Sequence, residues 1–443
     1  MSSDSAHAVT DEGEAAQVLV PKLRFPEFRD AGGWVPTPLR DVCEPINEKV
    51  GSAKLTPVSI TAGRGFVSQA SKFGRDISGV QYRNYTYLRQ GDFAYNKGNS
   101  LSYPQGWVCQ LKEFEEAAAS SAFICFRLRE DYHPTYFQAL FDQNVHGRQL
   151  RRFITSGARS NGLLNIRTDD FYGVKIPLPP KIAEQHKISD CLSTLDDLIA
   201  AERDRLVALR AYKQGLLQQL FPRPERIENG EKIPAETTPR LRFPEFRHAG
   251  EWEERTLAQI SPAIFDGTHQ TPTYVDEGVP FYSVENLVSG AANRFISQAD
   301  HDLATAKNKP EIGDLLITRI GKIGYSKIID WEGDFSIYVT LAVVKQSSGF
   351  NSGYMHAFFQ SERYQAELAQ RSLLNAVPCK INMDELRRSV VLLPSMAEQE
   401  RIASCFSDCD RGIEAQFDRV KALKTHKFGL MQQLFALPCE VAA

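Results

Sequence analysis

Apolar residues recur at alternating steps of four and three along residues 184–221, and again along residues 398–435. This heptad spacing gathers apolar side chains into one seam on a helix, and two such seams pack together as a coiled coil. The expected seam consists of Ile188, Leu192, Leu195, Ile199, Leu206, Leu209, Leu216 and Leu220 in the first helix and of Ile402, Phe406, Cys409, Ile413, Val420, Leu423, Leu430 and Leu434 in the second. The two stretches align without a gap, and about half of the paired residues are identical. We therefore expect the two helices to pair with each other.

Polar residues interrupt the two seams at the same places. Glu202 in the first helix corresponds to Gln416 in the second, and Lys213 corresponds to Lys427. The alternative is that two unrelated amphipathic helices belong to two separate cores. Chance would not repeat a seam together with its defects, so the pattern favours a duplicated helix.

The duplication extends to the segment before each helix. The motif Pro-x-Leu-Arg-Phe-Pro-Glu-Phe-Arg occurs at residues 21–29 and again at 239–247, and Trp34 recurs as Trp252. Each motif opens a globe with short strand-like runs bounded by turns and one helix of moderate length. Strands are expected at residues 85–88, 122–128, 315–320 and 336–344, and helices around 136–141 and 354–359.

The predicted fold class is therefore α+β. We expect two globular α/β-mixed domains, separated by two long helices that form an antiparallel coiled coil, with a pseudo-twofold internal repeat. The expected divisions are a disordered N-terminal tail at 1–19, the first globe at 20–180, its helix at 181–221, a polar, proline-broken linker at 222–238, the second globe at 239–394, its helix at 395–436 and a C-terminal tail at 437–443.

Composition adds constraints without naming a function. The chain has 443 residues, 42% hydrophobic and 24% charged, with a net charge of −3, so a site for a polyanion would have to be local. It carries no signal-peptide pattern and no apolar run long enough for a membrane. Its eight cysteines form no C-x-x-C pair. Cys405 and Cys409 could share a metal, but small core residues are the favoured interpretation, and a cytoplasmic location is expected.

Catalytic patterns are missing from the sequence. It contains no G-x-x-x-x-G-K-[ST] phosphate loop and no glycine-rich fingerprint for a dinucleotide or for S-adenosylmethionine. His269 stands in a loop without a nearby Ser or Cys partner. A non-catalytic protein is therefore expected.

Local charge is more informative in both globes. Residues 143–168 contain five arginines and no acid, and residues 315–329 contain Arg319, Lys322 and Lys327 and no acid. Arginines among Ser, Asn and Gly are typical of phosphate-binding surfaces, and loops rich in Lys, Asn, Gln and Ser can read base edges. The alternative for each segment is an ordinary solvated helix face or hydrated loop.

Several features together resemble the specificity (S) subunit of type I restriction–modification systems. They are the globe–helix–globe–helix order, the Leu-Arg-Phe-Pro-Glu-Phe motifs at Leu23 and Leu241, the Gly-Asp-Phe-Ala-Tyr-Asn-Lys stretch at 91–97, the Gly-Thr-His-Gln-Thr-Pro loop at 267–272, and the Ala-Glu-Gln helix starts at Ala183 and Ala397 with Gly-Leu-x-Gln-Gln-Leu-Phe ends.

The resemblance implies that each globe is a target recognition domain for one half of a split, asymmetric DNA sequence. It implies a non-catalytic subunit that binds double-stranded DNA, two methyltransferase (M) subunits and, in the nuclease form, two restriction (R) subunits. No cofactor is then expected on this chain; S-adenosylmethionine, ATP and magnesium would belong to the partner subunits.

The donor-rich segments supply the expected DNA contacts, with arginines mainly on phosphates and Asn96, His269 and Gln270 as readers of bases. The expected contacts are Tyr95, Asn96, Lys97, Ser100, Arg148, Arg151, Arg152, Arg159 and Asn161 in the first globe and Thr268, His269, Gln270, Thr271, Arg319, Lys322, Arg371 and Lys380 in the second. Two alternatives stay open: an adaptor whose globes bind proteins, and an enzyme with an unrecognised nuclease or methyltransferase site.

Overall fold

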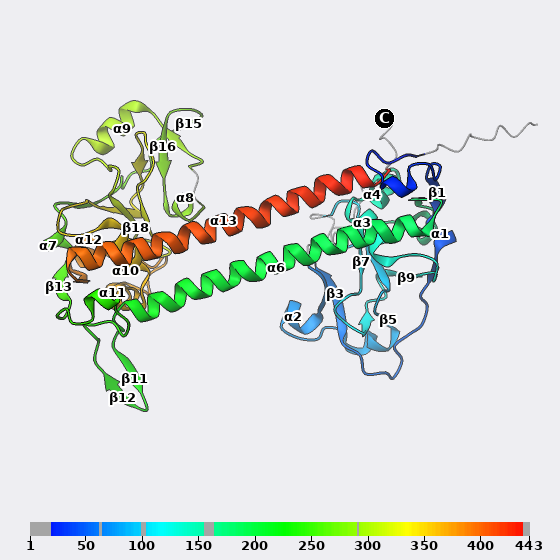
Figure 1. The fold of residues 1–443 in the computed structure, drawn as a ribbon, viewed down its shortest axis with the longest axis horizontal. Coiled ribbons are helices and arrows are strands. Elements are labelled where there is room, and N and C mark those ends of the chain that lie inside the picture. The colour runs from blue at the N-terminus through cyan, green and yellow to red at the C-terminus, as the bar shows by residue number, and fades with distance from the viewer. Residues whose placement is uncertain (1–18, 62–63, 99–102, 155–163, 290–291, 437–443) are drawn as a thin grey trace, which may run out of the picture. The chain divides into compact units, whose positions relative to one another are not determined.

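The chain folds into two compact units, each with its own hydrophobic core (Figure 1). The computed structural model describes residues 19–61, 64–98, 103–154, 164–289 and 292–436. Unit 1 comprises Met1–Ala201 with Val420–Ala443, and unit 2 comprises Glu202–Arg419. The long helices α6 (Ile182–Leu220) and α13 (Met396–Leu434) each contribute one part to unit 1 and the other part to unit 2.

Unit 1 contains two four-stranded sheets, with strand orders β2-β9-β6-β7 and β4-β3-β8-β5, and a β1-β10 pair. Its strands are β1 (Val35–Pro38), β2 (Cys43–Pro45), β3 (Pro57–Thr61), β4 (Gly65–Ser68), β5 (Thr86–Arg89), β6 (Phe93–Asn96), β7 (Trp107–Gln110), β8 (Glu116–Ala119), β9 (Ile124–Leu128) and β10 (Lys175–Leu178). Its shorter helices include α1 (Leu39–Val42), α2 (Gln69–Phe73), α3 (Pro134–Asp142), α4 (Val145–Leu150), the 3-10 turn η3 (Arg151–Phe153) and α5 (Thr168–Tyr172).

Unit 2 repeats the order of the first sheet, as β14-β21-β18-β19, and the two-stranded pair, as β13-β22, whereas its other sheet, β15-β17-β16-β20, has a different strand order. Its strands are β13 (Glu253–Thr256), β14 (Ile264–Asp266), β15 (Tyr274–Val275), β16 (Val279–Tyr282), β17 (Phe295–Ile296), β18 (Leu315–Thr318), β19 (Ser326–Ile328), β20 (Ser336–Ile337), β21 (Leu341–Val344) and β22 (Val390–Leu393). Its shorter helices are α7 (Leu257–Ile260), α8 (Val284–Ser289), α9 (Gln298–Thr305), α10 (Ser352–Gln360), α11 (Glu362–Arg371) and α12 (Met383–Arg388).

These elements confirm the predicted α+β class and the internal repeat. The strands expected from the apolar runs are present, although the run at 336–344 is divided between β20 and β21. The expected helices correspond to α3 and α10. The polar segment at 222–238, predicted to be a linker, contains an antiparallel hairpin of β11 (Arg226–Glu228) and β12 (Glu231–Ile233). Two polar, charged strands of three residues leave no apolar alternation to detect.

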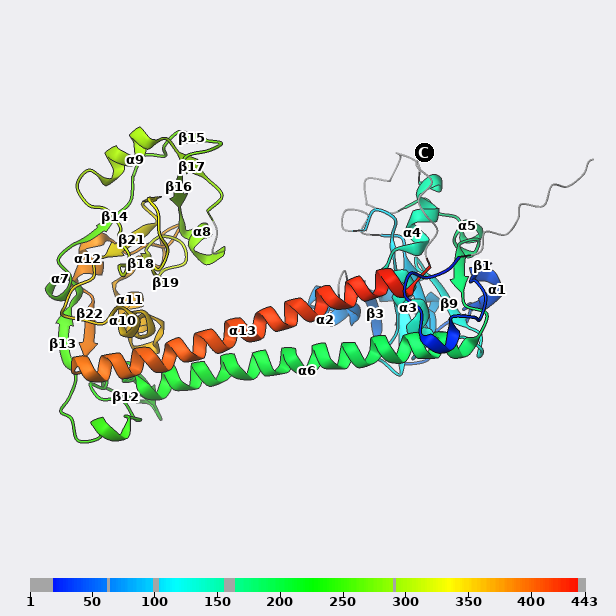
Figure 2. The ribbon, with the colours of Figure 1, turned by 45° about the horizontal axis from the view of Figure 1, so that its top comes forward.

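Within each unit, the parts of α6 and α13 that belong to it lie side by side and run in opposite directions (Figure 2). In unit 1, Lys427 Nζ donates to Asp196 Oδ1 at 2.5 Å, and in unit 2, Lys213 Nζ donates to Asp410 Oδ1 at 2.6 Å. Nine of the expected seam residues are buried: Ile188, Leu192, Ile199, Leu206, Leu220, Ile402, Phe406, Val420 and Leu434. The others are half-buried: Leu195, Leu209, Leu216, Cys409, Ile413, Leu423 and Leu430.

The C-terminal end of each long helix packs into a globe. In unit 1, the ring of Phe435 lies 6.2 Å from that of Trp34 and 5.2 Å from that of Tyr136, measured between centroids. In unit 2, Phe221 makes the equivalent contacts with Trp252 at 6.1 Å and Tyr354 at 5.8 Å. The repeated aromatic residue after each helix is therefore a core residue of the unit into which the helix runs.

The repeated motif at 21–29 and 239–247 binds the C-terminal end of a long helix in each unit. In unit 1 the backbone N–H of Leu23 donates to Gln433 O at 2.9 Å, and in unit 2 Leu241 donates to Gln219 O at 3.0 Å. These bonds satisfy carbonyl groups in the last turn of each helix, where no further helical N–H is available. The adjoining arginine of each motif forms an ion pair with the long helix that begins in the same unit.

That ion pair is buried in both units. Arg24 donates to both carboxylate oxygens of Glu184 at 2.7 Å, and the two side chains are 7% and 1% exposed. Arg242 and Glu398 repeat the pair at 2.9 and 2.5 Å. A bidentate geometry gives each carboxylate two charge-assisted hydrogen bonds, which offset the cost of removing both charges from water.

Candidate nucleic-acid interface

Arg319 is the centre of a set of loops in unit 2. It follows β18, and its guanidinium donates to Asp266 Oδ2 at 2.9 Å, to Val339 O at 3.0 Å and to Ile381 O at 3.3 Å. Only 7% of the residue is exposed, which leaves little of its surface for the predicted contact with DNA. Burial lowers the pKa of Arg319, and the charge of Asp266 opposes that shift. Arg319 therefore connects the end of β14, the turn between β20 and β21 and the segment after α11.

The loop after β14 is held in place through its backbone. Thr268 N donates to Ile337 O at 3.1 Å, and Val339 N donates to Thr268 O at 3.1 Å. Gly267 allows this approach, because a Cβ there would lie 2.0 Å from the Ile337 carbonyl oxygen. His269, the residue after these backbone hydrogen bonds, is exposed, and its Nε2 lies 3.1 Å from Asp266 Oδ2.

The same loop presents further polar side chains. Gln270 and Thr271 are exposed, and Thr268 is half-buried. The Thr271 hydroxyl lies 3.4 Å from the Tyr338 hydroxyl. The arrangement leaves an imidazole, an amide and a hydroxyl accessible on a fixed backbone, and such groups form hydrogen bonds with base edges.

Two lysines lie on the neighbouring loops. Lys322 is exposed, and its Nζ is 5.1 Å from the centroid of the Tyr325 ring. Lys380 is also exposed and pairs with Ile320 and with Leu373 through isolated β-bridges. Lys322 lies on the loop that carries Arg319, and Lys380 is bridged to the same loop at Ile320. Exposed lysines of this kind can neutralise phosphates.

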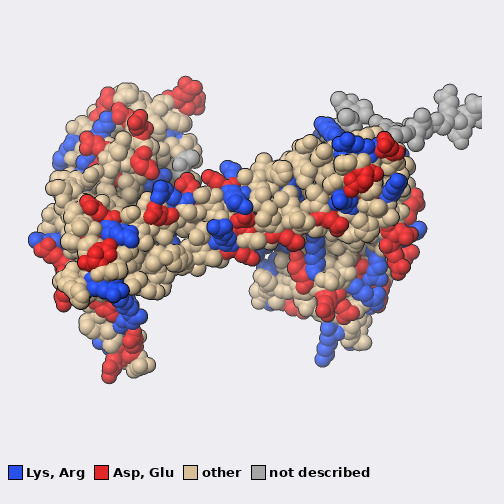
Figure 3. Space-filling view, in the orientation of Figure 1, with Lys and Arg blue, Asp and Glu red and all other residues tan. Residues whose placement is uncertain are grey.

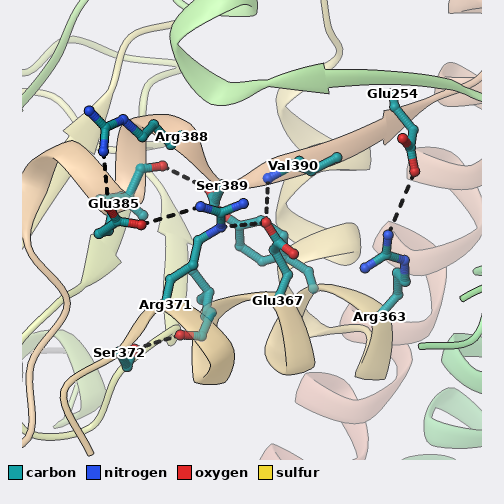
Figure 4. A network of polar contacts seen from close by, with 12 residues as sticks. Glu254, Arg363, Glu367, Arg371, Ser372, Glu385, Arg388, Ser389 and Val390 are labelled. Carbon is teal, nitrogen blue, oxygen red and sulfur yellow. Dashed lines mark hydrogen bonds and ion pairs between the residues drawn. The ribbon is translucent and has the colours of Figure 1, made fainter. Parts of the chain in front are cut away.

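Arg371, also predicted to contact DNA, binds two carboxylates within unit 2. Its Nε donates to Glu367 Oε1 at 2.6 Å, and its Nη1 donates to Glu385 Oε2 at 3.3 Å (Figure 4). Glu367 Oε1 also accepts from the backbone N–H of Val390 at 2.9 Å. Burial lowers the pKa of Arg371, but the hydrogen bonds and charges of Glu367 and Glu385 outweigh it, so the net shift is upward. Two carboxylates already occupy this guanidinium, which joins α11 to α12 and β22.

In unit 1, Tyr95, also predicted to contact DNA, is a core residue. It is fully buried on β6, its ring stacks on Phe171 at 4.6 Å, and its hydroxyl donates to Gln105 O at 2.7 Å. Burial raises the pKa of the phenol. Tyr95 lies on the same face of β6 as Phe93, and both belong to one hydrophobic cluster. The loop composition used to select Tyr95 could not reveal that orientation.

The last residue of β6 and the residue after it are accessible in part. Asn96 and Lys97 are half-buried; Asn96 Oδ1 accepts from Gly98 N at 2.8 Å, and Lys97 O accepts from Leu164 N at 2.9 Å. The latter bond is matched in unit 2, where Ile381 N donates to Arg319 O at 2.9 Å. Ser100, Arg159 and Asn161, also expected to contact DNA, lie outside the described residues.

Three exposed arginines of unit 1 that the sequence predicts as DNA contacts lie on α4 and η3. Arg148, Arg151 and Arg152 are exposed, and the Arg152 guanidinium lies 4.7 Å from the centroid of the Phe153 ring. The buried His146 fixes α4 through a 3.3 Å contact between its Nε2 and Gly106 O. Burial lowers the pKa of His146 to about 4, so the ring is neutral at pH 7 and donates one hydrogen bond here.

Other kinds of site gain little support. Within residues 19–61, 64–98, 103–154, 164–289 and 292–436, no group of three or more His, Cys, Asp or Glu is placed to hold a metal ion. Among the helices of this described part, none has both the length and the apolarity to cross a membrane. Basic and acidic side chains are mixed over the visible face (Figure 3), so basic loops, and not a uniformly basic surface, distinguish the candidate interface.

Sequence reasoning missed several residues that position this interface. Asp266 was not selected, because it lies 53 residues before the arginine that it binds. Leu217 and Met431, at equivalent positions of the two helices, are buried outside the expected seam. The repeat itself was the available signal for Leu217 and Met431, since equivalent apolar residues in both copies indicate the same packing.

Two units that share the strand order of one sheet and differ in their donor-rich loops define a duplicated binding protein. The model of the type I restriction modification DNA specificity domain matches residues 32–211 and again 249–423. The chain therefore belongs to this family, and the resemblance noted in the sequence is confirmed.

Relatives and solved structures agree with this family. The specificity subunit of the type I restriction enzyme MjaVIII of Methanocaldococcus jannaschii is 23% identical over 304 residues, 64% of this chain and 66% of that protein. The putative MjaX specificity subunit of the same organism is 24% identical, over 42% of this chain and 45% of that protein. The aligned stretches thus span less than two thirds of these relatives.

The fold is also similar to two solved structures. A type I restriction–modification S subunit from M. genitalium has a TM-score of 0.54 and 13% identity, covering 94% of this chain and 99% of that one. A chain from a study of complex assembly and conformational transition in the type I R-M system has a TM-score of 0.55 and 16% identity, covering 91% and 97%. These likenesses concern the fold alone.

Proposed function

We propose that this chain is the DNA sequence-specificity subunit of a type I restriction–modification complex, in which each unit reads one half of a bipartite, asymmetric target. The observation that carries the proposal is the contrast between a repeated frame and unlike loops. Both units keep the buried Arg–Glu pair. Both also keep the packing of the phenylalanine after the long helix on a Trp and a Tyr, here called the aromatic clasp. By contrast, Lys97 follows β6 where Arg319 follows β18. A frame that is kept while its loops differ suits two readers of different sequences.

In this proposal the chain performs no chemistry. It binds duplex DNA and two methyltransferase subunits, and in a nuclease form two restriction subunits. S-adenosylmethionine, ATP and magnesium act on those partners. The antiparallel helices keep a fixed number of base pairs between the half-sites. The setting is the cytoplasm, where these partners and the DNA are available.

The test is genome-wide mapping of methylated bases in cells with and without the chain. The expected result is a split motif that is methylated only when the chain is present. Methylation that does not depend on the chain would contradict the proposal. Binding of the purified complex to duplex DNA should also weaken with salt, which a protein-binding adaptor would not require.

A further inference from the structure

A loop of unit 2 beside the Arg319 centre exposes apolar side chains. In the segment 372–381, Leu373 is 49% exposed, Leu374 is 59% exposed and Val377 is fully exposed. Isolated apolar residues on a surface need no explanation, but three of them within five positions form a local apolar tip.

Backbone hydrogen bonds hold the loop that carries this apolar tip. Leu373 N donates to Lys380 O at 2.8 Å, which closes the loop at its base. Gly321 N donates to Cys379 O at 2.8 Å, and Cys379 Sγ donates to Gly321 O at 2.8 Å. The tip is therefore joined to the loop that follows β18, the same loop that carries Lys322.

The surrounding charge indicates the partner. Lys322 and Lys380 are exposed on either side of the loop–loop junction, and residues 371–383 contain no Asp or Glu. A partner must then offer negative charge together with a small apolar feature. The major groove of duplex DNA offers both, because phosphates flank it and each thymine presents its C5-methyl group there.

We propose that Leu374 and Val377 read thymine methyl groups in the half-site bound by unit 2, while Lys322 and Lys380 hold the neighbouring phosphates. This inference rests on the proposed function and adds a base-reading surface that is apolar. The tip supplies contact area for a methyl group, and the two lysines limit the orientations in which the groove can approach.

The first experiment uses the full chain with its methyltransferase partner in cells. The double variant Leu374→Ser, Val377→Ser should lose its preference for thymine at one or two positions of one half-site and keep the other half-site unchanged. The control Leu303→Ser, an exposed leucine of α9, should leave the whole motif intact. An unchanged motif in the double variant would overturn the inference. Loss of the methyltransferase subunit from the complex, without a change of motif, would also overturn it and assign the tip to a protein.

A second measurement does not depend on a variant that folds. The wild-type complex should bind a duplex of the mapped target about fourfold more weakly for each contacted thymine replaced by uracil, the loss expected for one buried methyl group. Equal binding to both duplexes would contradict methyl reading. A wild-type chain that directs no split motif would instead remove the proposed function, and this inference with it.

Discussion

Glu202 and Gln416 occupy equivalent positions of the two long helices, and they contact each other. Gln416 Nε2 donates to Glu202 Oε2 at 2.6 Å and to Glu202 O at 2.9 Å across a separation of 214 residues. Arg419 Nε lies 2.7 Å from the other carboxylate oxygen of Glu202. Equivalent positions of the two repeats therefore contact each other as an amide–carboxylate pair, which requires a different residue in each repeat.

This contact predicts a pH-dependent effect of Gln416→Glu. The hydrogen bond from Gln416 lowers the pKa of Glu202; burial opposes this shift, and the charge of Arg419 adds to it. A lowered carboxyl pKa stabilises the fold above the ordinary value of about 4.3 and loses that contribution as the pH falls through the lowered value. The variant places two carboxylates together, so its melting temperature should fall by several degrees at pH 7 and recover toward wild type near pH 4.

The matched control is Glu202→Gln, which replaces the pair by two amides. It removes the partner of Arg419 but adds no repulsion, so its smaller loss of melting temperature should stay nearly constant between pH 4 and pH 7. Equal pH profiles for the two variants would mean that the carboxylates do not meet.

The aromatic clasp of unit 1 predicts a large loss of stability for Phe435→Ala. Phe435 is 3% exposed and packs on Trp34 and Tyr136. Truncation of a buried Phe costs about 3–5 kcal/mol. Phe428→Ala on the same helix, at a side chain that is 59% exposed, should change the free energy of unfolding little. Chemical denaturation of both variants checks this, and similar losses would count against the clasp.

The buried ion pair predicts that Arg24→Met is more harmful than removal of both charges. Arg24→Met leaves the Glu184 carboxylate, 1% exposed, without its two donors from Arg24, a defect that typically costs about 3–5 kcal/mol. The double variant Arg24→Met, Glu184→Met removes the isolated charge and should recover part of that loss. Denaturant unfolding of the three chains provides the measurement. No recovery in the double variant would show that the carboxylate is paired elsewhere.

Exposed basic residues and a basic residue already bound to carboxylates should respond differently to substitution in DNA-binding assays. Lys322→Ala and Arg151→Ala should each weaken binding to all sequences and flatten the slope of log K against log salt by about one. Arg371→Ala should leave that slope unchanged and lower stability, because its guanidinium binds Glu367 and Glu385. Salt titrations of the purified complex measure both effects. A flatter slope for Arg371→Ala would show that Arg371 contacts phosphates and contradict this prediction.

Local periodicity was sufficient to predict the long helices, because heptad spacing depends only on residues close in sequence. The orientation of Tyr95 and the burial of Arg319 were not predictable in the same way. Loop composition identifies donor-rich segments but does not say which side chains turn inward, and the partner of Arg319 is distant in sequence. The hairpin of β11 and β12 was not predicted from the sequence, because its strands are short and polar.

The central claim is that the two units read separate half-sites, and one comparison tests it most directly. Methylated bases are mapped in cells that carry the wild-type chain, Asn96→Ala or Gln270→Ala. The account predicts that Asn96→Ala relaxes the motif in one half only and that Gln270→Ala relaxes it in the other half only. Relaxation of the same half by both variants, or of both halves by either one, would contradict it.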